Sequence, residues 1–137
     1  NLAPVSFFMY ASFKPPMLAF AMGKASNSGE NVRRDGKAML AIPGTSLKEA
    51  VMAYGSSSGS EKDKLEELPI PTQSVEGSDI MIPKDTRVAF AVSLIQTLDS
   101  GDHYLYLCNI DKIYADETKT ALFTWNGYEK VAPAEEK

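Results

Sequence analysis

The sequence predicts a small antiparallel β-barrel that carries two or three short helices. Between Arg87 and Leu94, large apolar residues alternate with polar or small ones, which is the period of a half-buried strand. Asp99-Ser100-Gly101-Asp102 is a hairpin connection into the β-prone segment His103–Tyr114. Near the end of the chain, Asn-Gly lies inside Ala121–Val131 and is typical of a tight turn between two short strands.

The N-terminal part of the chain adds three predicted strands. Leu2–Ser12 and Met17–Met22 are apolar segments separated by Pro15-Pro16, which cannot donate ladder hydrogen bonds, so we expect two buried strands. Met17–Met22 has few polar residues, which predicts that both of its faces are covered, one of them by a second subunit. Lys37–Ile42 is the third strand, and Pro43-Gly44 ends it.

Helix signals lie between these strands. A first helix is expected to be capped by Asn27 or Ser28 and to be ended by Gly36, the usual C-terminal residue. The pattern Ser-Leu-Lys-Glu is a capping box and predicts a second helix over Ser46–Tyr54. Glu61–Leu68 is predicted to be a polar helical turn whose charged side chains form a solvated face.

The composition indicates one globular domain of 137 residues, which we place at residues 1–131 with a polar tail at 132–137. The net charge of -4 and the pI near 5.0 argue against a nucleic-acid or anionic-membrane partner, because both need a basic surface. No uncharged apolar run approaches the ~20 residues of a membrane helix, and no signal peptide is recognisable. The single cysteine, Cys108, excludes an intrachain disulfide and a structural cysteine–metal site, and it fits the cytoplasm.

The first candidate binding site is the segment Gly23–Asn31. A helix N-terminus offers unpaired N–H groups and a positive dipole end, which together attract a phosphate. Lys24 adds a charge, and Ser26 and Ser28 add hydroxyl donors. A plain helix cap beside an exposed lysine explains the same residues, so the spacing alone leaves both interpretations open.

The second candidate is His103, the only histidine, at the start of a predicted strand. Its imidazole could contact a substrate or move a proton, or it could be a surface or packing residue. One histidine with one distant cysteine does not supply a metal site. Three tyrosines on that strand share one face by alternation and could stack on a ligand or pack in a core or dimer face: Tyr104, Tyr106 and Tyr114.

Hydrolytic and nucleophilic enzymes find no support in the sequence. It has no Gly-x-Ser-x-Gly elbow, and Cys108 lies mid-strand among apolar residues, as expected of an inert core thiol. If the protein is an enzyme, a bound cofactor therefore supplies the chemistry.

Four segments, in order, resemble the flavin reductase-like, FMN-binding split-barrel family. Asn1–Pro16 resembles its asparagine–small–proline–serine strand, and Asn27–Val32 followed by Gly36 resembles its first helix. Ser58–Lys64 resembles its Ser-Gly-Arg … Asp-Lys loop, and Gly101-Asp102-His103 resembles its Gly-Asp-His element.

This resemblance implies a mainly-β, six-stranded antiparallel Greek-key split barrel, usually a homodimer with FMN between the subunits. It implies a catalytic place for His103 near a nicotinamide donor. It also implies that the family's first strand precedes Asn1. The residues that it assigns to the cofactor are Val5, Ser6, Tyr10, Ala11, Ser12, Met22, Gly23, Lys24, Ser26, Asn27, Ser28 and Asn31.

The function that follows from the resemblance is hydride transfer from NAD(P)H to FMN, with free flavin or a partner oxidoreductase as the electron acceptor. FAD or a deazaflavin could occupy the same pocket. A flavoredoxin-like FMN carrier without a nicotinamide site is the alternative, and Ser60, where an arginine is common, favours it. A barrel that has lost flavin altogether is the third interpretation.

Overall fold

The computed structural model describes residues 1–56, 63–125 and 130–134. The protein is mainly β with short helices, as the sequence predicts. Its strands are β1 Phe8–Phe13, β2 Pro16–Gly23, β3 Lys37–Pro43, β4 Thr72–Gln73, β5 Ile82–Pro83, β6 Thr86–Ser100, β7 His103–Ala115, β8 Leu122–Trp125 and β9 Lys130–Pro133. Its helices are α1 Asn27–Asp35, the 3-10 helix η1 Thr45–Leu47, α2 Lys48–Gly55 and α3 Lys64–Glu67.

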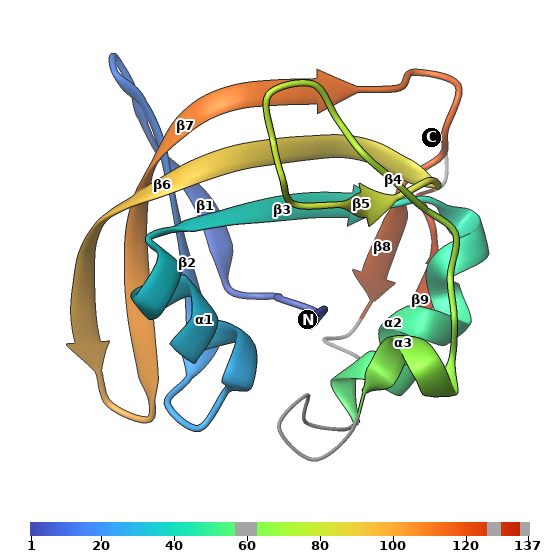
Figure 1. Ribbon diagram of the computed structural model, residues 1–137, viewed down its shortest axis with the longest axis horizontal. Helices are drawn as coiled ribbons and strands as arrows, with labels where there is room; N and C mark the ends of the chain where they lie inside the picture. Colours follow the sequence, from blue (N-terminus) through green and yellow to red (C-terminus); the bar gives the residue numbers. More distant parts are fainter. Residues whose placement is uncertain (57–62, 126–129, 135–137) are drawn as a thin grey trace.

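Five strands form one sheet in the order β1-β2-β7-β6-β3, with every neighbouring pair antiparallel. β4 pairs with β5, and β8 pairs with β9, as separate two-stranded ribbons. In Figure 1 the curved sheet arches over the helices, with α1 below one end and α2 and α3 below the other. The N-terminal segment lies between α1 on one side and α2 and α3 on the other.

The core lies under β2, β6 and β7. Leu18, Ala19 and Phe20 are buried in succession, so both faces of β2 are covered, as predicted. The cover comes from this chain itself, so the burial of β2 gives no indication of a second subunit. Cys108 is fully buried beside Leu18, and burial raises the pKa of its thiol to about 11, which agrees with the predicted inert core thiol.

The predicted buried strand Leu2–Ser12 is wrong in two respects. β1 begins only at Phe8, and the hydrogen bond from the Ala21 N–H to the Phe7 carbonyl, 2.9 Å, precedes it. β1 is an edge strand, since only β2 pairs with it, and most of its side chains are exposed; Phe13 is 92% exposed. An apolar run therefore marks the strand here but not its burial, because burial depends on neighbours far along the chain.

Helix α1 begins one residue earlier than predicted. Its N-cap is Ser26, whose Oγ accepts a hydrogen bond from the Gly29 N–H at 3.1 Å, in place of Asn27 or Ser28. Gly36 ends the helix in the left-handed conformation, with φ of 70°, as predicted. Several neighbouring small polar residues could cap this helix, and which of them does so depends on where the backbone leaves the helical conformation.

The predicted capping box at the second helix does not form. Thr45–Leu47 turns as a 3-10 helix, and α2 starts at Lys48 without a side-chain cap. Ser46 instead binds Asp85, which accepts hydrogen bonds from the Ser46 N–H at 2.9 Å and from its hydroxyl at 2.6 Å. These hydrogen bonds hold the pKa of Asp85 below its usual value, and the carboxylate caps this turn from the far side of the chain.

The C-terminal hairpin has strands on both sides of its predicted turn. β8 and β9 pair from Leu122 with Pro133 to Trp125 with Lys130, whereas Asn126-Gly127 lies outside the described residues. β9 also extends two residues into the predicted tail, to Pro133. Within the described ranges, no helix has the length and apolar character needed to cross a membrane.

Candidate functional site

A cavity of about 800 Å³ lies between the N-terminal segment, the end of β2, the start of α1 and the end of α2. Its volume falls in the range of ~300–1,000 Å³ that small-molecule sites occupy. Its lining residues are Asn1, Ala3, Pro4, Val5, Ser6, Phe7, Ala21, Met22, Gly23, Ala25, Ser26, Asn27, Ser28, Val51, Met52, Tyr54, Gly55, Ser56, Lys64 and His103.

The cavity brings together most of the site residues that the sequence predicts. Those that line it are Val5, Ser6, Met22, Gly23, Ser26, Asn27, Ser28 and His103. Tyr10, Ala11 and Ser12 lie on β1, where the Tyr10 ring packs edge-on against Phe90 with centroids 5.9 Å apart. Lys24 and Asn31 are also outside its lining. These five residues lie outside the cavity lining, and the role of all thirteen predicted site residues stays a prediction.

The start of α1 presents donors to the cavity. The Gly29 N–H binds the Ser26 hydroxyl, and the Glu30 N–H binds the Ser26 carbonyl at 3.0 Å. Because a helix leaves its first N–H groups without intrahelical acceptors, those of Asn27 and Ser28 remain for a ligand. The Ser28 Oγ accepts from the Asn1 side-chain amide at 2.5 Å, so its own proton is free to be donated. This end of the cavity suits an anion.

Lys64 is the cavity residue that sequence reasoning placed wrongly. It was expected on a solvated face, yet it is only 6% exposed. Its Nζ donates to the Leu2 carbonyl at 3.0 Å and to the Tyr54 carbonyl at 2.9 Å, and burial lowers its pKa. In the sequence, only the Asp-Lys pair indicates a role for Lys64. The aspartate of that pair has a separate role, because Asp63 caps α3.

His103 reaches the cavity from the first position of β7. Its Nδ1 lies 2.6 Å from the Asp102 carboxylate, and its ring packs on Phe7 with centroids 5.1 Å apart. The hydrogen bond with His103 lowers the pKa of Asp102, which keeps this carboxylate ionised as a partner for the imidazole. With Nδ1 engaged, Nε2 is the ring nitrogen left for a ligand.

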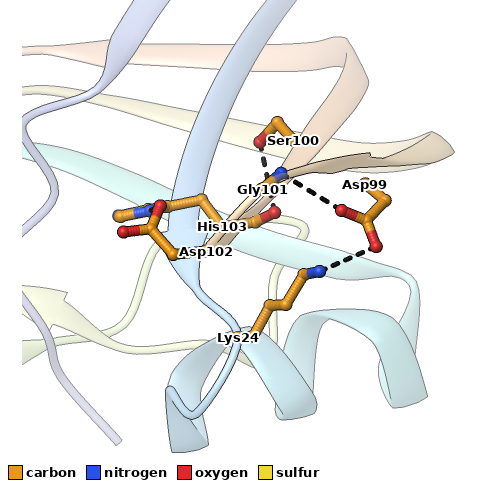
Figure 2. A network of polar contacts seen from close by, with 6 residues as sticks. All are labelled: Lys24, Asp99, Ser100, Gly101, Asp102 and His103. Atoms are coloured by element: carbon orange, nitrogen blue, oxygen red, sulfur yellow. Dashed lines mark hydrogen bonds and ion pairs between the residues drawn. The ribbon is translucent and has the colours of Figure 1, made fainter.

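Lys24 does not line the cavity, and its side chain reaches Asp99 beside the β6–β7 turn (Figure 2). Its Nζ lies 2.7 Å from the Asp99 carboxylate, and this hydrogen bond raises the pKa of Lys24 and lowers that of Asp99. The sequence predicts a lysine beside a phosphate site, but the acid that binds it lies 75 residues away, where spacing carries no information.

Each of the three tyrosines of β7 contacts a basic side chain. Tyr106 is fully buried, and its hydroxyl accepts a hydrogen bond from Arg33 at 2.6 Å. Lys24 Nζ and Arg33 Cζ lie over the Tyr104 ring, at 5.2 Å and 4.7 Å from its centroid. None of the three lines the large cavity, which favours the packing interpretation over ligand stacking.

A second cavity of about 350 Å³ lies on the other side of the N-terminal segment and is lined mainly by apolar side chains. Ala3–Ser6 lines both cavities, so this short segment separates them. Among the described residues, no group of three or more His, Cys, Asp or Glu side chains is placed to hold a metal ion.

Relatives of known structure share this fold. The FMN-binding protein from Thermus thermophilus, with bound p-hydroxybenzaldehyde, is 18% identical, and the match covers all of this chain and 79% of that chain with a TM-score of 0.86. Flavoredoxin from Methanosarcina acetivorans is 17% identical, with 100% and 78% of the chains covered and a TM-score of 0.85. The flavin reductase PheA2 is 18% identical, with 94% and 77% covered and a TM-score of 0.75.

Sequence comparison adds a curated relative and a family. An uncharacterized protein from Archaeoglobus fulgidus is 24% identical over 112 residues, which are 80% of this chain. The matched segment spans 62% of that relative's length. The model of the flavin reductase like domain matches residues 1–132. With this match over nearly the whole chain and with the fold of FMN-binding relatives, the chain belongs to the flavin reductase-like domain family.

Proposed function

We propose that this protein binds FMN in the large cavity and passes a hydride from NAD(P)H to it. One observation carries the proposal: a single cavity of about 800 Å³ gathers the donor-rich start of α1, the Val5–Ser6 backbone and His103. These are the elements that a phosphate, a planar ring and a nicotinamide would need. FMN, when bound, would supply the two-electron chemistry that the side chains lack.

The residues present fit this cofactor. The N–H groups of Asn27 and Ser28 and the Ser28 hydroxyl would hold its phosphate, and the buried ammonium of Lys64 would add positive potential at the cavity wall. A ring beside Val5 and Met22 would be shielded from water. A Cβ built at Gly23 meets nothing within 4 Å, which leaves room beside the end of β2.

His103 would act on the nicotinamide donor. Asp102 holds the imidazole at Nδ1, so Nε2 can bind a polar group of the donor and orient it. The Phe7 ring against His103 would exclude water from this part of the cavity.

The visible spectrum of the purified protein tests the proposal. The protein is reconstituted with FMN and, separately, with FAD, and NADH or NADPH is then added without oxygen. A bound flavin that bleaches supports the reductase. A bound flavin that does not bleach supports a carrier, and failure to bind either flavin contradicts both functions.

Replacing Ser28 by alanine should weaken FMN binding about tenfold, because it removes one hydrogen bond to a charged phosphate, worth about 1.5 kcal/mol. Fluorescence titration of FMN measures this change. Ser78→Ala is the matched control, since Ser78 accepts from the Ile80 N–H and does not line the cavity. Equal FMN affinity in both variants would exclude the Ser28 hydroxyl as a phosphate ligand.

A flavoredoxin-like electron carrier is the second candidate. Ser60 favours it, because an arginine is common at this position in the family. In that case, the reduced protein should pass electrons to a partner oxidoreductase and should show no saturable dependence on NADH or NADPH. Steady-state kinetics with both nucleotides separate the two candidates.

We also propose that the protein forms a homodimer through the surface of β1 and the residue before it. Large apolar side chains are exposed along this edge, namely Phe7, Phe8, Met9, Tyr10 and Phe13. Contiguous apolar surface of this kind is typical of a protein–protein contact. Met9→Arg should convert the dimer to a monomer in sedimentation experiments, whereas Met81→Arg, at an exposed methionine away from β1, should not.

A further inference from the structure

Lys24, the residue that follows β2, contacts the turn that leads into His103. The Lys24 backbone N–H donates to the Asp102 carbonyl at 3.0 Å, within the turn itself. Its Nζ binds Asp99, before the turn, and lies over the ring of Tyr104, after it. Lys24 therefore contacts the turn at its beginning, middle and end.

Asp99 connects the Lys24 side chain to the backbone of the turn (Figure 2). One carboxylate oxygen binds Lys24, and the other accepts from the Gly101 N–H at 3.1 Å. Gly101 has φ of 86°, a conformation that side-chain-bearing residues rarely adopt. The Ser100 hydroxyl also donates to the His103 carbonyl at 3.2 Å. The same carboxylate thus binds the lysine and the backbone of the turn.

The position of the imidazole depends on this turn. Asp102, which holds the His103 Nδ1, is the turn residue whose carbonyl binds Lys24. A shift of the Asp102 peptide would therefore move its carboxylate as well, and the ring would lose its place against Phe7 at the cavity.

We propose that Asp99 and Lys24 are positioning residues for His103, and that Lys24 does not bind the phosphate of the cofactor. The proposal competes directly with the role that the family resemblance implies for Lys24. Its kinetic consequence rests on the proposed function, whereas its structural consequence can be measured on the free protein.

Nuclear magnetic resonance of the imidazole nitrogens tests the positioning, and His103 is the only histidine, so its signals need no assignment. At a pH where the ring is neutral, we expect the tautomer with the proton on Nδ1 in the native protein. Asp99→Ala and Lys24→Met should move the ring toward the Nε2–H tautomer and reduce its ring-current shift from Phe7. Lys24→Arg should restore the native signals, because it keeps the charge and the donors.

The matched control is Lys37→Met. Lys37 forms an exposed ion pair with Asp79 at 2.8 Å, similar to that of Lys24 with Asp99, but at the start of β3. The His103 signals should not change in this variant. Unchanged signals in both Asp99→Ala and Lys24→Met would overturn the proposal.

Kinetics separate the two roles of Lys24. As positioning residues, Lys24→Met and Asp99→Ala should each raise the KM for NADH about two- to fivefold, as expected of an exposed ion pair, and should not add in the double variant. FMN affinity should not change. A loss of FMN affinity in Lys24→Met alone would make Lys24 a phosphate ligand and overturn the proposal. If no variant and no native protein oxidises NADH, the proposed reductase fails while the nitrogen signals still decide the positioning.

Discussion

Replacing Gly44 by alanine should destabilise the protein by about 2 to 3 kcal/mol, although its φ of -81° suits any residue. A Cβ at this position would overlap the carboxylate of Asp85. Asp85 cannot move aside without releasing both hydrogen bonds from Ser46, and these bonds cap the turn that starts α2. The free energy of unfolding in urea measures the loss.

A double-mutant cycle isolates this cause. Asp85→Ala should by itself cost about 1 to 2 kcal/mol for the lost cap. Gly44→Ala added to Asp85→Ala should cost little more, because the overlapping carboxylate is gone. If the two losses add, the overlap with Asp85 is not the reason that Gly44 is needed.

Acid should show the same contact from the other direction. The hydrogen bond from Ser46 lowers the pKa of Asp85 in the folded state, so its contribution is present above the unfolded pKa of about 4. That contribution is lost as the pH falls through the lower folded value. The difference in stability between the native protein and Asp85→Asn should therefore shrink as the pH falls below about 4.

The second large effect is expected at Lys64. Lys64→Ala should cost about 2 kcal/mol, since the carbonyls of Leu2 and Tyr54 would lose a charged donor. FMN affinity should fall more than tenfold, because the N-terminal wall of the cavity would no longer be tied to α2 and α3. Amide exchange at Ala21, whose N–H donates to the Phe7 carbonyl of this wall at 2.9 Å, should become faster in this variant.

Two further variants separate donor from volume. Lys64→Met keeps most of the side-chain volume but not the donors, so it should share the faster exchange and the weaker FMN binding. Lys48→Ala, at an exposed lysine on α2, is the control and should leave both unchanged. Normal exchange at Ala21 in Lys64→Met would show that the hydrogen bond to Leu2 does not hold this wall.

Features that depend on neighbouring residues could be predicted from the sequence. The turn before His103, the end of α1 at Gly36 and the strand Lys37–Ile42 all rest on local backbone preferences, and each is confirmed. The mainly-β class follows from the same short-range patterns. Eight of the site residues that the family resemblance implies line one cavity, because the order of the motifs along the chain fixes the topology.

The misplaced features depend on partners far along the chain. Ser46 has the sequence of a local capping box, yet it binds Asp85, a charged acceptor in the connection between β5 and β6. Lys64 looks like one charge among many, and only the tertiary structure brings two carbonyls to it. Lys24 follows the same rule, since its partner lies on the far strand of a hairpin. Each of these three side chains binds a partner that the fold brings close to it. The spacing of residues along the sequence does not show which partner that is.

The segment Ala3–Ser6 links the volumes of the two cavities, because it lines both of them. Its residues form the boundary of a space of about 800 Å³ on one side and about 350 Å³ on the other. Volume gained by one cavity can come from the other, because a shift of this segment enlarges one and reduces the other. Variants selected to accept bulkier flavin analogues should therefore carry smaller side chains in the smaller, apolar cavity, at positions such as Leu40 and Ile42, which do not line the larger one.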